Sequence, residues 1–95
     1  MSVGDDIAAS TRPRLPRGVR LSRDQTRGGF VLLAPERIIR ADPIAAAVLE
    51  RCDGVRTLGE IVDDLCVSYR GERRRIETDV RGLLADLSAK KMIEL

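Results

Sequence analysis

The fold is decided by residues 30–43, which read FVLLAPERIIRADP. The first four residues are an apolar run that includes an aromatic and a β-branched side chain, which is typical of a buried strand. Pro35 fixes its own φ angle and suits the first central position of a tight turn. Residues 37–41 then predict another short strand. At Asp42-Pro43 the hydrophobic period changes from that of strands to that of helices.

The segment before this stretch predicts one more strand. Residues 19–22 (VRLS) alternate apolar and polar side chains, which is the period of a half-buried strand, and residues 24–29 predict a turn that ends in two glycines. Three strands joined by short turns make a small antiparallel sheet. Residues 1–11 have no such period and low hydrophobicity, so we expect a flexible N-terminal arm in front of a domain over 12–95.

Three helices are predicted after residue 41. Asp42 suits the capping position and Pro43 the first helical position, and Gly54 stands where the helix would end. Thr57 and Glu60 form a capping box that opens the second helix. The apolar stripes of these two helices are expected to be Ile44, Ala45, Val48, Leu49 and Cys52, and then Leu58, Ile61, Val62, Leu65, Cys66 and Tyr69.

The third helix is expected to follow Gly71 and to run from about Glu72 to Lys90. Its apolar positions are Ile76, Val80, Leu83, Leu84 and Leu87, and residues 92–95 are expected to pack back on the core. The predicted class is therefore α+β, a three-stranded antiparallel sheet followed by three helices. Because the last two helices are joined near one glycine, the arrangement also resembles a winged helix-turn-helix.

Composition limits the classes of function. The chain has 95 residues, of which 43% are apolar and 34% charged, and this fits one small globular domain. No segment approaches the length of a membrane span, and the acidic start MSVGDD lacks the features of a signal peptide, so we expect a cytoplasmic protein. Cys52 and Cys66 both fall on apolar helix faces, where reduced cysteine acts as a small hydrophobe.

Catalysis by this chain alone is not expected. There is no histidine, which removes the commonest general base and the commonest metal ligand. The two cysteines are too far apart for a CxxC motif. Gly28-Gly29 lacks the spacing of a phosphate-binding loop, and Asp63-Asp64 would point in diverging directions on a helix. We therefore predict neither enzyme activity, nor a metal, nor a cofactor.

Binding of nucleic acid and binding of peptide remain as alternatives. A DNA-reading last helix would need a basic exposed face, and residues 73–75 and Arg81 supply positive charge. Glu72, Glu77, Asp79 and Asp86 on the same helix would repel phosphates, which argues against this alternative. The strand over 37–41 is expected at an edge of the sheet, where unpaired backbone groups accept an extended peptide.

Several segments resemble one known family. They are residues 12–21 (RPRLPRGVRL), residues 31–37 (VLLAPER), residues 45–49 (AAAVL) and the turn Cys52-Asp53-Gly54, and the spacing to Thr57, Ile61 and Asp79-Val80 agrees. These segments are similar to coenzyme PQQ synthesis protein D, and the resemblance covers roughly residues 12–95. The VLLAPER segment and the turn carry most of its specificity, because helical leucines are common.

The resemblance implies a peptide chaperone in the biosynthesis of pyrroloquinoline quinone (PQQ). Such a protein binds the ribosomal precursor peptide, protein A of the pathway, and presents it to a radical SAM enzyme, protein E. It contains the RiPP recognition element, in which the leader peptide adds beside the third strand and lies against the third helix. Carried over to this sequence, the peptide-binding residues are Arg37, Ile38, Ile39, Arg40, Ala41, Arg75, Ile76, Asp79, Val80 and Leu83. The radical chemistry would belong to the partner enzyme.

Overall fold

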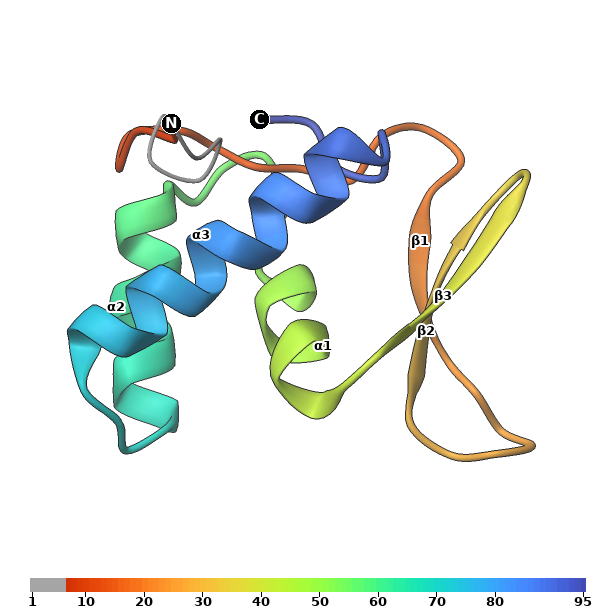
Figure 1. Ribbon diagram of the computed structural model, residues 1–95, viewed down its shortest axis with the longest axis horizontal. Helices are drawn as coiled ribbons and strands as arrows, with labels where there is room; N and C mark the ends of the chain where they lie inside the picture. The colour runs from red at the N-terminus through yellow and green to blue at the C-terminus, as the bar shows by residue number, and fades with distance from the viewer. Residues whose placement is uncertain (1–6) are drawn as a thin grey trace.

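The computed structural model describes residues 7–95 and has three strands followed by three helices (Figure 1). The strands are β1 (Arg20–Arg23), β2 (Phe30–Ala34) and β3 (Arg37–Ala41), and the helices are α1 (Pro43–Glu50), α2 (Leu58–Ser68) and α3 (Arg73–Ala89). The sheet is antiparallel in the order β1-β2-β3, so β1 and β3 are its two edges. The predicted α+β class is confirmed.

All three helices lie on one face of the sheet, and α1 is enclosed between the sheet and the α2–α3 pair (Figure 1). The enclosure explains why four consecutive residues of α1, from Ala46 to Leu49, are all buried. Small alanine side chains allow neighbouring elements to approach this helix from several sides. The most completely buried side chains around it are Leu32, Leu58, Ile61, Leu65 and Leu84.

Side chains of the sheet alternate between the core and the solvent. Leu32 of β2 stands opposite Leu21 and Ile39, and this row faces the helices. The next pair along, Leu33 and Ile38, faces away from them. Burial in β3 alternates in the same way, because Ile38 is 69% exposed whereas Ala41 is only 7% exposed.

Both predicted helix starts are confirmed. The Asp42 carboxylate accepts a hydrogen bond from the backbone amide of Ala45 at 2.7 Å. Thr57 and Glu60 form the full capping box, with distances of 2.9 and 3.1 Å. These caps fix where α1 begins after the sheet and where α2 begins after the turn that follows α1.

Two predicted helix ends were wrong. The first helix ends at Glu50, and Gly54, although it has a positive φ of 78°, lies in the following turn. The second helix ends at Ser68, because the backbone of Tyr69 is already extended before Gly71 is reached. In both cases the apolar pattern continues past the last helical residue, so the pattern alone overestimates the length of the helix.

The C-terminal residues pack back on the core, as predicted. Lys91 adopts a positive φ of 59°, and Met92 donates its backbone amide to the Leu87 carbonyl at 2.8 Å, which closes α3 in a Schellman motif. Met92 and Ile93 are buried as a result. None of the helices found over residues 7–95 is both long and apolar enough to cross a membrane.

The described part of the expected N-terminal arm packs on the domain. Ile7 is 6% exposed and belongs to the core. The amides of Leu58 and Gly59, at the start of α2, donate to the carbonyls of Thr11 (2.7 Å) and Ala9 (3.0 Å). The helix start thus has partners for amides that its own turn cannot satisfy. Residues 1–6 of the expected arm lie outside the described residues.

Candidate peptide-binding site

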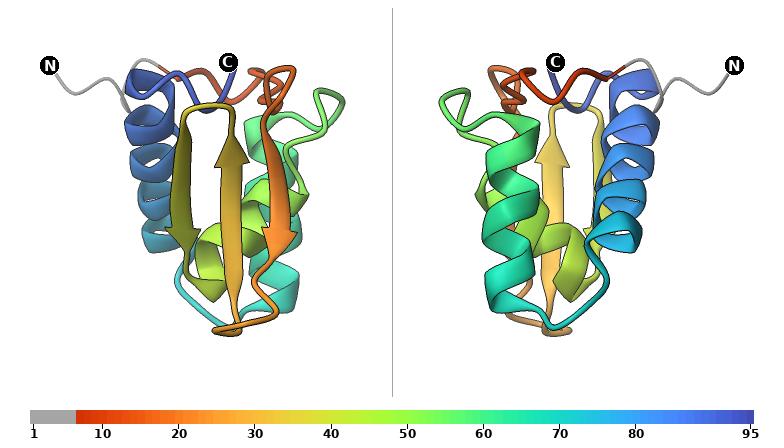
Figure 2. Two further views of the ribbon diagram at one scale, coloured as in Figure 1. Left: turned by 90° about the vertical axis from the view of Figure 1, so that its right-hand side faces the viewer. Right: turned by 90° about the vertical axis from the view of Figure 1, so that its left-hand side faces the viewer.

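β3 is an edge strand, and in the view onto the sheet α3 lies behind this edge, on the helical side (Figure 2). The hairpin between β2 and β3 has a two-residue loop, and Ala34 and Arg37 are the pair that closes it. Hydrogen-bonded and non-hydrogen-bonded pairs alternate along an antiparallel ladder, and the closing pair is hydrogen-bonded. The backbone amides and carbonyls of Ile38 and Arg40 therefore point to the open edge, where a further strand could pair with them.

A hollow of about 290 Å³ opens where β3 ends. It lies between the start of α1, the end of α2 and the first half of α3. Eight of its lining residues are apolar or aromatic, namely Ile44, Ala45, Val48, Leu65, Tyr69, Ile76, Val80 and Leu83, and the other two are Asp42 and Asp79. Because Asp42 directly follows Ala41 in the chain, the open edge of β3 leads straight to this hollow.

Large apolar side chains are exposed along this edge and hollow. Ile38 on β3 is 69% exposed, Ile44 is 60% exposed and Tyr69 is 44% exposed. Ile44 and Tyr69 belong to the apolar stripes predicted for their helices, but both side chains remain exposed. Each lies at an end of its helix, where no neighbouring element covers it. Exposed apolar groups beside an open strand edge are typical of a binding surface.

The predicted site residues occupy different environments. Ile76, Asp79, Val80 and Leu83 line the hollow, and the first four residues of β3 follow the edge. Arg75 is exposed on α3, one position before the lining residues. Ala41 and Val80 are almost fully buried, at 7% and 2% exposed, so they shape the site from below. Individual peptide contacts of all ten residues stay a prediction.

The side chain of Arg40 has a structural task of its own. Its guanidinium donates to the Asp24 carboxylate and to the Gly28 carbonyl, both at 2.8 Å, and thereby ties β3 to the turn between β1 and β2. Asp24 also accepts the backbone amides of Thr26 and Arg27. These bonds, chiefly the one from Arg27, lower the pKa of Asp24, so the carboxylate stays ionised and the turn stays ordered.

The three consecutive arginines at the start of α3 differ in their environments. Arg73 forms an ion pair with Asp63 of α2 and so links the two helices. No ion pair forms at Arg74 or Arg75 within residues 7–95. Arg75 lies one turn before Asp79 of the hollow on α3.

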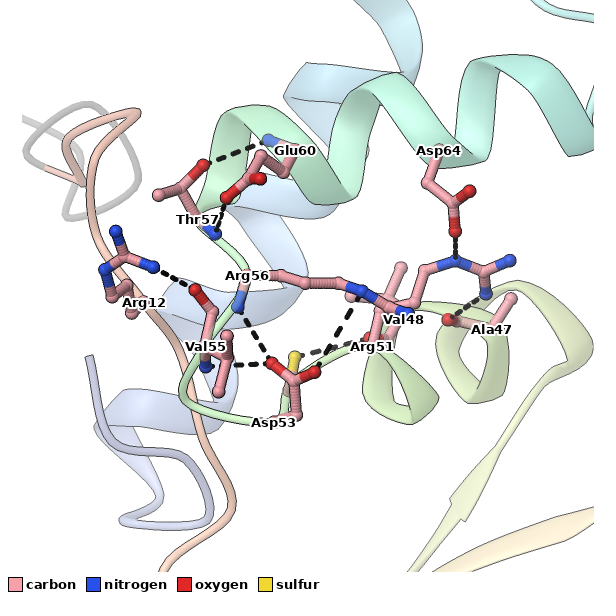
Figure 3. A network of polar contacts seen from close by, with 11 residues as sticks. Arg12, Ala47, Val48, Arg51, Asp53, Val55, Arg56, Thr57, Glu60 and Asp64 are labelled. Atoms are coloured by element: carbon pink, nitrogen blue, oxygen red, sulfur yellow. Dashed lines mark hydrogen bonds and ion pairs between the residues drawn. The ribbon is translucent and has the colours of Figure 1, made fainter.

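The turn Cys52-Asp53-Gly54 follows the C-terminal end of α1, whereas the hollow lies around its start. Figure 3 shows the polar contacts of Asp53 in this turn. The Asp53 carboxylate accepts the backbone amides of Val55 and Arg56, each at 2.9 Å, and these two bonds lower its pKa. The Gly54 amide donates to the Pro13 carbonyl at 3.0 Å. The turn thus joins α1, α2 and the N-terminal segment, which is a structural role.

The two cysteines have the packing role that the sequence predicts, to different degrees. Cys52 is buried, and its thiol donates to the Val48 carbonyl at 3.3 Å. Burial raises the pKa of this thiol to about 12, so it is neutral and a poor nucleophile at physiological pH. Cys66 is only partly buried, but it also packs against the core.

This arrangement defines a class of small peptide-binding domains, with an open third strand, a neighbouring third helix and an apolar hollow between the helices. Comparison with known proteins identifies the family. Residues 29–93 match the family model described as coenzyme PQQ synthesis protein D. The chain belongs to this family, as the sequence resemblance predicts.

Curated relatives agree over nearly the whole chain. A protein of Rhodopseudomonas palustris (strain BisB5), named PqqA binding protein, is 43% identical over 84 residues, or 88% of this chain and 82% of the relative. A protein of Xanthomonas oryzae pv. oryzae (strain KACC10331 / KXO85) with the same name is 42% identical over 89 residues, or 94% of this chain and 97% of the relative.

Solved structures share the fold. The NMR structure of the PqqD truncation of Methylobacterium extorquens PqqCD, described as a functional and stand-alone RiPP recognition element, is 43% identical and superimposes with a TM-score of 0.82. That likeness covers 94% of this chain and 95% of the other. TbiB1 in complex with the TbiA(beta) leader peptide, at 23% identity and a TM-score of 0.73 over 85% of this chain and 94% of the other, shares the fold.

Proposed function

We propose that this protein is a peptide chaperone of PQQ biosynthesis, which binds the ribosomal precursor peptide and presents it to a radical SAM enzyme. Two similar proteins are named PqqA binding protein, and a third is described as a RiPP recognition element. The observation that carries the proposal here is the open edge of β3, which leads directly into an apolar hollow. We place the protein in the cytoplasm, where ribosomal peptides are made.

The mechanism is strand addition. Backbone groups of Ile38 and Arg40 pair with an extended segment of the precursor, and these bonds depend little on the peptide's sequence. Selectivity then comes from side chains that the peptide places in the hollow against Ile76 and Leu83. The domain supplies binding and orientation only, and every step of bond chemistry takes place in the partner enzyme.

The outward amides provide the sharpest test of strand addition. Proline has no amide to donate, so Ile38→Pro and Arg40→Pro each remove one bond to the peptide but none to β2. Because the unmatched peptide carbonyl is left without a partner, we expect affinity for the precursor to fall roughly tenfold to a hundredfold. The matched controls are Ile38→Ala and Arg40→Ala, which keep the amide and should bind within a fewfold of wild type.

Affinity is measured by titrating labelled precursor peptide, and circular dichroism first establishes that each variant is folded. Nuclear magnetic resonance of the wild-type domain should show amide shifts along residues 37–41 and 76–83 during the same titration. Folded proline variants that bind as tightly as wild type would place the peptide elsewhere and refute strand addition at this edge.

A further inference from the structure

The face of the sheet that turns away from the helices has an apolar centre. We define the outer sheet face as Arg20, Ser22, Val31, Leu33, Ile38 and Arg40, which alternate with the core-facing residues of the three strands. Leu33 and Ile38 stand directly opposite each other, and Val31 lies two residues from Leu33 on the same strand. No described element covers this face (Figure 2).

The rim of this face is positively charged. Arg20 and Arg40 lie on the face itself, and Arg17 and Arg27 are exposed in the turns at the two ends of β1. Asp24 is already engaged by Arg40 and by two turn amides. Within residues 7–95, no carboxylate forms an ion pair with Arg17, Arg20 or Arg27. An apolar centre with unpaired guanidinium groups around it is complementary to a protein surface with carboxylates around an apolar contact.

We propose that the outer sheet face is a second docking surface, which binds an acidic, apolar-centred surface of the modifying enzyme. This inference rests on the proposed function, because it names the face that meets the partner enzyme. A nucleic acid is a poorer fit, since the aliphatic pair Leu33 and Ile38 offers nothing to phosphates. Strand addition uses the edge of the sheet, in its plane, so it leaves the outer face free.

The two surfaces are coupled by the geometry of a sheet. A peptide strand that pairs with β3 continues the sheet, so alternate side chains of the peptide emerge on the outer face beside Ile38. An enzyme docked there contacts the domain and the bound peptide together. The precursor peptide should therefore raise the affinity of the domain for the enzyme, and the enzyme should raise the affinity for the peptide by the same factor.

Two variants outside the peptide-binding set test this surface. Arg20→Glu reverses a rim charge, and Leu33→Gln removes an apolar group at the centre while nearly keeping its size. Matched controls are Lys91→Glu and Val67→Gln, which make the same kinds of change at exposed residues on the helical side. Each folded variant is titrated with labelled precursor peptide, and then, at saturating peptide, with the radical SAM enzyme of the pathway.

Arg20→Glu and Leu33→Gln should bind the peptide within about twofold of wild type and the enzyme at least tenfold more weakly, and the effect of Arg20→Glu should shrink as salt is added. Wild-type affinity of both variants for the enzyme, or no complex with the enzyme at all, would overturn the docking proposal. Loss of peptide binding in these variants would also overturn it. So would a wild-type domain that binds duplex DNA together with variants that do not. Failure of the wild-type domain to bind precursor would instead refute the proposed function.

Discussion

The two ends of α1 differ in how their surroundings are held. At the end of α1, the turn over residues 52–57 is bonded to the N-terminal segment, because Gly54 donates its amide to Pro13. That segment in turn pairs with the C-terminal one, since Arg14 and Glu94 share two backbone bonds and a side-chain bond. At the start of α1, the hollow is lined mainly by apolar side chains, and two large ones, Ile44 and Tyr69, remain exposed. We call these regions the closed end and the open end.

This difference between the two ends assigns the stability of the fold to the closed end and the binding of peptide to the open end. Polar groups at the closed end are matched within the chain, so changes there should act on the folded state. Apolar groups at the open end have partners only on one side, so changes there should act on the peptide. One of the two segments with the most specific family resemblance, the Cys52-Asp53-Gly54 turn, belongs to the closed end. The resemblance at this turn therefore reports how the fold is held.

The largest effect is expected from Gly54→Ala at the closed end. Gly54 has a φ of 78°, and an added Cβ would meet Arg14 Cβ at 3.3 Å. Left-handed strain and the crowded contact together should lower the free energy of unfolding by about 2 kcal/mol. The matched control is Gly28→Ala, with a φ of 75° and nothing within 4 Å of its Cβ, which has strain alone.

Denaturant unfolding measures both glycine variants. The control should lose about 1 kcal/mol, and peptide affinity should be unchanged in both variants under conditions where each is folded. Equal losses would show that Arg14 gives way freely, and a weakened peptide affinity in folded Gly54→Ala would show that the two ends are coupled.

A pH effect is expected next, from Cys52. Burial raises the pKa of the Cys52 thiol from 9.0 to about 12. Above pH 9 the thiol ionises in the unfolded chain but stays neutral in the folded one, and this favours unfolding. The contribution of the thiol to folding stability is therefore complete below pH 9 and is lost as the pH rises toward 12. Between pH 8 and pH 10.5 the loss attributable to this thiol should be about 2 kcal/mol. The free energy of unfolding of Cys52→Ala is measured over the same pH range, so that the difference from wild type isolates the contribution of this thiol. Parallel plots of stability against pH for variant and wild type would contradict the prediction.

The smallest effect concerns the open end. Ile44→Ser removes an apolar side chain that is 60% exposed at the rim of the hollow. Its loss should weaken binding of the precursor about tenfold, or about 1.4 kcal/mol, with little change in stability. Val67→Ser is the control, because Val67 is 85% exposed away from the hollow. An unaltered affinity of Ile44→Ser, or an equal loss in the control, would remove Ile44 from the binding surface.

Much of the fold could be predicted because its signals are local. The two-residue turn at Pro35, the cap at Asp42 and the box of Thr57 and Glu60 each depend on residues within three positions of one another. Helix ends were less predictable. Tyr69 continues the apolar period of α2, but the neighbouring elements do not reach that far, and periodicity carries no information about where a neighbour ends.

The candidate site was predictable in part. The order of the strands places β3 at an edge, and the spacing of Ile76, Val80 and Leu83 gives one face of α3. The hollow was not predictable, because it depends on how α1, α2 and α3 meet. Arg40 shows the same limit, since nothing in its local sequence indicates that its guanidinium reaches Asp24 and Gly28.

The tie between Arg40 and the turn after β1 has a consequence for kinetics. It holds β3 to the neighbouring turn before any peptide arrives, so we expect most of the conformational freedom lost on association to be the peptide's. Among closely related ligands of a preformed surface, differences in affinity then lie mainly in how quickly each one leaves. A single precursor residue in the hollow can therefore set the residence time on β3, and with it the interval available for hand-over.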